Sequence, residues 1–449
     1  MNRNNDESTP RTRLTRREFV QTAAAAGLIM TVPAWAQEQA AKADELAVGM
    51  IGPGSQGRFL MTQCLKIPGI RFVAICDIWP YHQKYAANLL KKYDQPVNVY
   101  EDYREMLAKE KHLDAVIVAT PDWMHAEHSV ACMQAGKHVY CEKEMANTAA
   151  GARQMVQVAR DTGKLLQIGH QRRSQPRYWH ARKMIQKDKI LGRVTHTYGQ
   201  WNRARLFELG WPKGKELAAE TLKRYGYASM DEFRNWRWYR KYSGGPMADL
   251  GSHQVDIFNW FLQTQPKAVL ASGGLDYYTE QEGRNWYDNV LAIYEYDTAP
   301  GPVRGFYQVL NTTSSGGFYE QFMGDEGTLA ISDDGKTGYI TREVHAKRRE
   351  WEDEAAKIEK MGRDAIELKI GETLSPEGKK DPKAQQMLAE SMKDSRVLHL
   401  ENFFGAVRNG TPLSCPAEVA FETCVTVLKA NEAVESGRRV EFKPEEFQA

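Results

Sequence analysis

The sequence predicts an α/β protein of two domains: a parallel sheet covered by helices, then an α+β domain with a large mixed or antiparallel, open-faced sheet. From residue 46 onward, short apolar runs alternate with stretches of helical periodicity, which is the pattern of βαβ units in a parallel sheet. Beyond residue 193 the runs lengthen and alternate apolar with polar residues, which is typical of a sheet with one exposed face. The 449 residues leave room for both domains.

The first domain is expected over residues 44–172. Its strands are expected at Leu46–Ile51, Arg71–Cys76, Val97–Tyr100, Asp114–Thr120, His138–Cys141 and Leu165–Gly169. Its helices are expected at about Ser55–Ile67, Tyr81–Tyr93, Tyr103–Lys109, Asp122–Ala135 and Thr148–Thr162. Right-handed crossovers make such strands parallel, and ligands of such sheets bind at the carboxyl ends of the strands.

The second domain is expected over residues 173–449, beginning with a helix near Arg177–Gln186. Its strands are expected at Arg193–Arg203, Lys267–Gly273, Asn289–Tyr296, Val303–Leu310, Tyr319–Met323 and Gly327–Ile331. A helix should end near Leu262, and two closing helices near 397–408 and 417–436 should pack on the core. Residues 343–396 carry mixed charges and few apolar side chains, so we expect a solvated, partly helical insertion there.

A glycine-rich loop follows the first strand, with Gly52, Gly54 and Gly57 spaced as G-x-G-x-x-G. In a Rossmann fold these glycines make the tight turn, admit a pyrophosphate and let the helix pack on the strand. The second strand ends at Asp77, 20 residues after Gly57, where a carboxylate binds the ribose of a dinucleotide. A carboxylate accepts a 2′-hydroxyl and repels a 2′-phosphate, so the sequence favours NAD over NADP.

Two further places carry groups suited to chemistry. The strand His138–Cys141 delivers Glu142 and Lys143 to the end of the sheet, although a charged pair there is often only a solvated turn. Asp249 and His253 are four residues apart at the start of a predicted helix, so their side chains share a face. Such a pair is often structural, but the Gly-Gly-Pro sequence before it indicates a constrained site.

In these motifs the chain resembles the glucose-fructose oxidoreductase, inositol dehydrogenase and MocA family of two-domain oxidoreductases. The resemblance rests on the glycine loop, Asp77, Ala119-Thr-Pro-x-x-x-His125, Gly136-Lys-His-Val-x-x-Glu-Lys143 and Gly245-x-x-x-Asp-x-Gly-x-His253. It implies a cofactor site formed by Gly52, Gly54, Ser55, Gln56, Gly57, Asp77, Thr120, Pro121, His125, Glu142 and Lys143. The proline that follows the lysine in the family is Glu144 here, which removes a backbone restriction and adds a carboxylate.

The resemblance also implies catalytic roles for Lys143, Asp249 and His253. Hydride transfer from an alcohol to a nicotinamide needs a group that removes the hydroxyl proton, and a histidine with an ordinary pKa of about 6.5 suits that task. Asp249 would orient the imidazole or bind a substrate hydroxyl, and Lys143 would stabilise the developing alkoxide. No metal site is expected, because the six cysteines show no ligand spacing.

A sugar, polyol or glycoside is the substrate that the resemblance implies. The residues expected to contact it are Arg172, Arg203, Trp236, Trp238, Asp249 and His253. The tryptophans have an alternative place in the core or an interface, and the arginines on the surface. Two other functions stay open: an NAD-dependent glycoside hydrolase that oxidises its substrate transiently, and a non-catalytic sugar-binding protein on the same fold. The exposed sheet face suggests a homo-oligomer, a dimer or tetramer.

The N-terminus reads as a twin-arginine signal peptide. Thr15-Arg-Arg-Glu-Phe-Val-Gln21 precedes a short apolar run and Ala34-Trp-Ala36, so cleavage is predicted after Ala36. Removing it brings the net charge from +2 to about zero, which argues against nucleic-acid partners. The apolar run is too short for a stable membrane anchor. We therefore expect export to the periplasm by the twin-arginine machinery, with the cysteines mostly buried free thiols and the cofactor bound before export.

Overall fold

The computed structural model describes residues 45–204, 208–279, 283–360, 362–368 and 382–449. The signal peptide expected at 1–36 lies outside the described residues. Among the helices that are described, none combines the length and apolarity needed to cross a bilayer. Residues Leu46–Ala449 form a single compact unit that contains both sheets.

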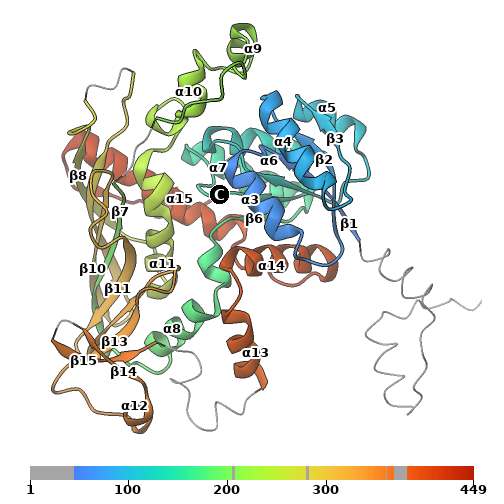
Figure 1. The fold of residues 1–449 in the computed structure, drawn as a ribbon. Coiled ribbons are helices and arrows are strands. Elements are labelled where there is room, and N and C mark those ends of the chain that lie inside the picture. Colours follow the sequence, from blue (N-terminus) through green and yellow to red (C-terminus); the bar gives the residue numbers. More distant parts are fainter. Residues whose placement is uncertain (1–44, 205–207, 280–282, 361, 369–381) are drawn as a thin grey trace, which may run out of the picture. The chain divides into compact units, whose positions relative to one another are not determined.

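The first sheet has six strands, all parallel, in the order β3-β2-β1-β4-β5-β6 (Figure 1). The strands are β1 (Leu46–Ile51), β2 (Ile70–Cys76), β3 (Asn98–Tyr100), β4 (Ala115–Val118), β5 (His138–Cys141) and β6 (Leu166–Ile168). All four residues of the central strand β4 are buried, as expected for a parallel strand covered on both faces. The predicted Rossmann fold class is therefore confirmed.

Five helices connect these strands, as predicted: α3 (Ser55–Cys64), α4 (Pro80–Lys91), α5 (Tyr103–Lys109), α6 (His125–Gln134) and α7 (Ala149–Thr162). The sequence sets both ends of α7. The Thr148 hydroxyl accepts from the Gly151 N–H at the start, and Gly163 ends the helix with φ +65°. A short 3-10 turn, η1 (Asp122–Met124), precedes α6 at the carboxyl edge of the sheet.

The second sheet has ten strands in the order β14-β15-β13-β12-β11-β7-β10-β9-β8-β16. They are β7 (Val194–Asn202), β8 (Ala268–Gly274), β9 (Asn289–Thr298), β10 (Gly301–Leu310), β11 (Phe318–Gly324), β12 (Gly327–Ile331), β13 (Gly338–Arg342), β14 (Lys357–Lys360), β15 (Arg363–Glu367) and β16 (Val440–Glu441). Strands β7 and β10 pair in parallel and the other pairs are antiparallel, so the sheet is mixed, as predicted. One face is packed, while Leu270, Leu291 and Ile293 are exposed.

Helices α8 (Pro176–Gln186), α11 (Ser252–Leu262), α14 (Ser395–Asn409) and α15 (Ala417–Ser436) link the two sheets. Helix α14 inserts Phe403 and Phe404 into the core beneath β1 and β4. Helix α15 packs on α7, α11 and β8 (Figure 1). The closing helices therefore fix the carboxyl edge of the parallel sheet against the second domain.

The charged stretch 343–396 differs from the expectation, because it contributes strands as well as helices. It forms α12 (Glu350–Glu354), β14, β15 and α13 (Pro382–Ser391), and β15 extends the sheet by pairing with β13. Strand β14 reads Lys-Ile-Glu-Lys, a charged sequence suited to a sheet edge that must not pair further. Because β14 is polar, it lacks the alternation of apolar residues by which the other strands of this sheet were predicted.

Candidate active site

The glycine loop after β1 is shaped by two close approaches. Gly52 has φ +84°, and a Cβ at Gly57 would lie 2.3 Å from the Gly52 carbonyl oxygen, so neither position accepts a larger residue. A Cβ on Gly54 would meet only the His82 ring, at 3.6 Å or more. The space beside Gly54 is therefore open toward the edge where a dinucleotide binds in this fold.

The N-terminus of α3 faces the same space. Its N-cap is Gly54, which has no side chain to cap the helix, and its first turn holds no acidic residue. The N–H groups of Ser55 and Gln56 are thus available to an anion at the positive end of the helix dipole. These features fit the pyrophosphate of a dinucleotide.

Asp77 lies at the carboxyl end of β2 beside this loop. Its Oδ1 accepts from the Trp79 N–H at 2.8 Å and its Oδ2 faces His82 Nδ1 at 3.1 Å. Each carboxylate oxygen has more than one lone pair, so the side chain is held in place and can still accept from a ribose hydroxyl. The geometry fits NAD and disfavours the 2′-phosphate of NADP.

The remaining expected cofactor residues fall into two groups. Glu142 is buried and accepts from Gln56 Nε2 at 3.1 Å, and burial raises its pKa. His125, by contrast, sits behind the site: its Nδ1 lies 2.7 Å from the Glu144 carbonyl and its Nε2 lies 2.8 Å from the Thr120 carbonyl. Burial lowers the pKa of His125 to about 4. It therefore links the loop at Thr120 and Pro121 to the main chain at Glu144.

Lys143 and Asp249 join the two domains at the centre of the site. Lys143 Nζ donates to the Asp249 carbonyl and lies 3.5 Å from its Oδ1. Asp249 also pairs with Arg237 at 3.2 Å and Arg203 at 3.8 Å. Burial alone would raise the pKa of Asp249, but the charges of Arg237, Lys143 and Arg203 bring it well below its ordinary range. The carboxylate of Asp249 is thus ionised and pairs with three cations. We call Asp249, these three cations and the neighbouring His253 the hub.

The turn that carries Asp249 is a π-helical segment, η4 (Met247–Gly251), which runs directly into α11 and His253. Such turns occur often at functional sites. His253 is 8% exposed and its Nδ1 has no hydrogen-bond partner among the described residues. Asp249 therefore does not orient this ring, contrary to one of the two roles expected for it.

The expectation that His253 has an ordinary pKa is wrong. Burial, reinforced by the charges of Lys143 and Arg172, lowers its pKa well below 6.5, so the imidazole is neutral at neutral pH. The ring is held by Trp201, which stacks on it with centroids 5.4 Å apart. Trp201 also stacks on Phe318 at 4.5 Å, and the two residues are register partners on β7 and β11.

Two of the residues expected to contact the substrate are placed elsewhere. Arg172 is 2% exposed and pairs with the buried carboxylate of Glu320, because an unpaired guanidinium is too costly to bury. Trp238 is 7% exposed, in an aromatic cluster with Tyr239 and Tyr242. The sequence could not distinguish these buried positions from exposed ones.

Trp236 and Arg203 remain close to the hub. Trp236 is covered by the Arg237 guanidinium, 4.1 Å from its ring centroid, and Arg237 pairs with Asp249. Arg203 lies at the end of β7, and its Nε has no hydrogen-bond partner within the described part of the chain. Arg203 therefore contacts Asp249 directly, whereas Trp236 is linked to it through Arg237.

Sequence reasoning missed His170 and Arg237. His170 is 1% exposed, lies 6.4 Å from the His253 ring centroid, and has both ring nitrogens without a partner among the described residues. A buried polar group without a partner costs about 1–3 kcal/mol, so His170 is suited to a bound molecule. The only sequence feature that pointed to His170 was its position just after β6, next to Gly169.

Glu144 is a buried residue that directly follows Lys143 in the chain. Its Oε1 accepts from its neighbour Met145 N–H at 2.7 Å, and its carboxyl is 1% exposed. Burial raises the pKa of Glu144 to about 8. The peptide bond between Lys143 and Glu144 is cis. The residue that replaces the proline is therefore a buried acid, and the preceding lysine still reaches Asp249.

No group of side chains suited to a metal ion occurs in the described ranges. All six cysteines are buried free thiols, as expected.

Two family models match the chain. Residues 46–170 match the model described as "Oxidoreductase family, NAD-binding Rossmann fold", and residues 214–442 match "Oxidoreductase family, C-terminal alpha/beta domain". The chain belongs to the glucose-fructose oxidoreductase, inositol dehydrogenase and MocA family. Its first domain is the NAD-binding domain of that family, as the glycine loop and Asp77 indicate.

Curated relatives and solved structures agree with this assignment. Inositol 2-dehydrogenase of Salmonella typhimurium is 32% identical over 230 residues, 51% of this chain and 56% of that protein. The match thus spans little more than half of that relative. A glycosyl hydrolase family 109 protein of Stenotrophomonas maltophilia is 34% identical over 136 residues, 28% of this chain and 29% of that protein. Levoglucosan dehydrogenase in complex with NADH and L-sorbose has the same fold, with a TM-score of 0.65 and 17% identity over 90% of this chain and all of that one.

Proposed function

We propose that this protein is an NAD-dependent oxidoreductase that transfers a hydride between a tightly bound nicotinamide and a hydroxyl of a sugar, polyol or glycoside. The observation that carries the proposal is the contact of Lys143 with Asp249, beside His253, at the carboxyl edge of the NAD-binding sheet. The similarity to inositol 2-dehydrogenase supports the choice of a polyhydroxylated substrate.

The residues of the hub have different roles in the proposed reaction. The nicotinamide, when bound, supplies the acceptor for the hydride. Lys143 Nζ donates to the substrate oxygen and stabilises negative charge as it develops, while Asp249 keeps the ammonium in place. His253 is neutral, so its unpartnered Nδ1 accepts the hydroxyl proton.

A segment of the second domain lies across the cofactor edge of the first sheet. We call residues 211–244 the strap; it includes α9 (Ala219–Arg224), α10 (Met230–Arg234) and the 3-10 turn η3 (Trp236–Trp238). Trp79 Nε1, two residues beyond Asp77, donates to the Lys215 carbonyl at 2.5 Å. At the other end, the Gly244 N–H donates to Asp122 at 3.0 Å. The strap therefore joins the ends of β2 and β4, between which the dinucleotide lies in this fold.

This arrangement supports the proposal that the cofactor is retained. A dinucleotide beneath the strap leaves only after Trp79 and Asp122 release their partners. The proposed twin-arginine export carries a folded protein to a compartment with little free NAD. A retained cofactor then requires that each reduction be followed by reoxidation on the enzyme, by the same substrate or a second one.

Homo-oligomerisation is the state that the open sheet face favours. Leu270, Leu291 and Ile293 are between 38% and 44% exposed on neighbouring strands β8 and β9. Clusters of exposed apolar side chains of this kind mark association surfaces, and a second copy would cover them by a two-fold axis.

A glycoside hydrolase that oxidises its substrate transiently is the second candidate. The observation that favours it is the match to the glycosyl hydrolase family 109 protein, 34% identical over 136 residues. Both candidates use the same hub, and they differ in whether a glycosidic bond breaks.

One experiment tests both candidates. The purified protein is incubated with inositols, sugars and aryl glycosides while reduced nicotinamide and released aglycone are followed together. Reduction without release supports the oxidoreductase, and release without net reduction supports the hydrolase. Lys143→Ala should abolish either signal, whereas the exposed Lys267→Ala should not. Absence of both signals with the native protein would contradict the proposal and favour a sugar-binding protein.

A further inference from the structure

Cations outnumber carboxylates in the hub. Its three cations surround one ionised carboxylate, that of Asp249. The neighbouring His253 is neutral, because burial and the nearby cations lower its pKa. Asp122 interacts electrostatically with Lys143 and Arg237, but burial raises its pKa to about 7, so it offsets their charges only in part at neutral pH. The hub therefore carries a net positive charge, which attracts anions.

The two arginines are the most exposed members of the hub. The side chains of Lys143 and Asp249 are each 14% exposed, whereas those of Arg203 and Arg237 are 37% and 42% exposed. The catalytic roles proposed above use the less exposed Lys143 and His253 and leave both arginines without a task. Arg203 and Arg237 are therefore accessible to a part of the substrate other than its reacting hydroxyl.

Each guanidinium reaches Asp249 with one nitrogen. Arg237 donates from Nε to Oδ1 at 3.2 Å, and Arg203 Nη2 lies 3.8 Å from Oδ2. A guanidinium carries five N–H donors in one plane. Each arginine can therefore pair with Asp249 and still donate to a second acceptor.

Arg237 is also held in a fixed orientation. Its guanidinium lies 4.1 Å from the ring centroid of Trp236, while its Nε is hydrogen-bonded to Asp249. A guanidinium that is already stacked and paired loses little side-chain freedom when a ligand binds. Carboxylate and phosphate groups accept two parallel N–H bonds from such a group, whereas a neutral hydroxyl gains no charge attraction.

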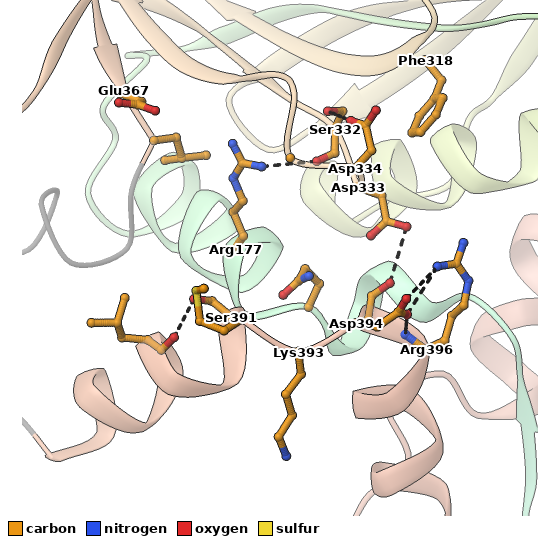
Figure 2. A pocket seen from close by; sticks show the side chains of 16 residues that line it. Arg177, Phe318, Ser332, Asp333, Asp334, Glu367, Ser391, Lys393, Asp394 and Arg396 are labelled. Carbon is orange, nitrogen blue, oxygen red and sulfur yellow. Dashed lines mark hydrogen bonds and ion pairs between the residues drawn. The ribbon is translucent and has the colours of Figure 1, made fainter. Parts of the chain in front are cut away.

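A cleft of about 820 Å³ elsewhere in the second domain lacks this excess of cations (Figure 2). Arg396 pairs there with Asp394 at 3.3 Å, and Arg177 donates to the Ser332 carbonyl at 3.5 Å. The described residues of its lining include carboxylates and cations, namely Asp333, Asp334, Glu367 and Asp394 against Arg177, Lys393 and Arg396. This cleft therefore offers an anion no net attraction, unlike the hub.

We propose that the substrate is an anionic sugar, whose carboxylate or phosphate group binds Arg237 and Arg203 while one of its hydroxyls reacts beside Lys143 and His253. The inference rests on the proposed function for the reacting hydroxyl, and it narrows the class of substrate. Uronic acids, their glycosides and sugar phosphates carry the required group. Neutral hexoses and inositols lack it, so they bind without the contribution of the two arginines.

Matched sets of anionic and neutral sugars test the inference. One set is glucuronate, glucose 6-phosphate and glucose, and the other is galacturonate, galactose 6-phosphate and galactose. Dissociation constants are measured by calorimetry on the full protein with NADH, so that no hydroxyl is oxidised. The variants are Arg237→Gln, Arg203→Gln and Arg237→Lys. Arg439→Gln is the matched control, since Arg439 is 41% exposed and pairs with Glu295 and Glu441, outside the hub.

In at least one set, an anionic sugar should bind the native protein and Arg439→Gln about tenfold or more tightly than its neutral counterpart, and the tighter of the two anions identifies the group. Arg237→Gln and Arg203→Gln should each lower this ratio of affinities about tenfold, the effect of one hydrogen bond to a charged group. Arg237→Lys should retain part of the ratio, because it keeps the charge and loses the planar fork.

Equal affinities for anionic and neutral sugars in the native protein, or an unchanged ratio in both glutamine variants, would overturn the inference. An equal loss of affinity for all the sugars leaves the ratio unchanged and counts against it. Oxidation is measured separately as the reduction of NAD. A preference for anions without any oxidation would support the inference and contradict the proposed function, whereas oxidation of neutral sugars without such a preference would do the reverse.

Discussion

The indole of Trp201 lies over the imidazole of His253, with ring centroids 5.4 Å apart and planes 26° from parallel. Trp201 belongs to β7 and His253 to α11, so the second sheet sets the orientation of the ring that we propose as proton acceptor. The residue four positions away, Asp249, binds cations instead. The two residues of the Asp-x-Gly-x-His motif therefore serve different parts of the site.

Trp201 is expected to act as a positioning residue. Trp201→Leu should lower kcat about tenfold with little change in KM, because the imidazole loses its stacked partner while the substrate contacts remain. Trp201→Phe should restore most of kcat, since a smaller ring still stacks. Steady-state kinetics check this prediction, and a purely structural role would instead lower the melting temperature of both variants without separating kcat from KM.

Asp249→Asn removes the carboxylate that gathers three cations. The ammonium of Lys143 then has no charged partner to hold it, and kcat/KM for the sugar should fall by about 100-fold or more, the range for loss of a preorganised electrostatic group. The affinity for NAD should change little, because Asp249 is not on the dinucleotide loop. Asp297→Asn, at a carboxylate that is 65% exposed, is the control. A fall shared equally by both variants would contradict the prediction.

Glu144 predicts a pH dependence of stability. Its pKa is raised from an ordinary 4.5 to about 8 by burial, so between these values the folded state holds a proton that the unfolded state has lost. The stability from this group is complete below about pH 4.5 and declines until about pH 8. Glu144→Gln keeps an acceptor for Met145 and cannot ionise. Its melting temperature should match the native protein at pH 5 and exceed it by pH 8; a constant difference across this range would refute the assignment.

The parallel sheet could be predicted from the sequence almost strand by strand. Buried strands such as Ala115–Val118 are continuous apolar runs, and caps such as Thr148 and Gly163 mark helix ends locally. Strand β14 could not be predicted, because an edge strand made of Lys357-Ile-Glu-Lys360 gives no apolar signal. Local pattern identifies strands that must be buried, and not those that are paired only through their backbone.

The site residues also divide into those that the local sequence predicts and those that it does not. Gly52, Asp77, Lys143 and Asp249 were found because each follows a predicted strand or starts a predicted helix. Arg237 and His170 were missed, since their positions depend on how the strap and β6 fold back on the hub. Arg172 was misplaced for a related reason: its burial is explained by Glu320, 148 residues away. Long-range charge pairs of this kind leave no mark in the local sequence.

Asp77 is expected to decide between the two dinucleotides. Asp77→Ser removes the negative charge that repels a 2′-phosphate while keeping a small acceptor for Trp79. The ratio of NADP to NAD bound should rise at least tenfold. The cofactor extracted from the purified variant and identified by mass spectrometry checks this prediction, with Asp94→Ser, far from the ribose site on the turn after α4, as the control. An unchanged ratio would place the ribose away from Asp77.

The strap predicts slow release of the cofactor. Tyr227, within the strap, packs against Trp123 with ring centroids 5.7 Å apart. The Tyr227 hydroxyl accepts a hydrogen bond from Trp123 Nε1 at 3.3 Å. Tyr227→Ala removes this contact and should raise the rate of NAD release at least tenfold, because fewer aromatic contacts then hold the strap against the first domain. Tyr277→Ala is the matched control, at a tyrosine outside the strap that is 69% exposed. NAD retained after gel filtration, and its exchange with labelled NAD, give the rate. Equal release from both variants and the native protein would show that the strap does not hold the cofactor, and the proposed passage of bound NAD through export would lose its structural support.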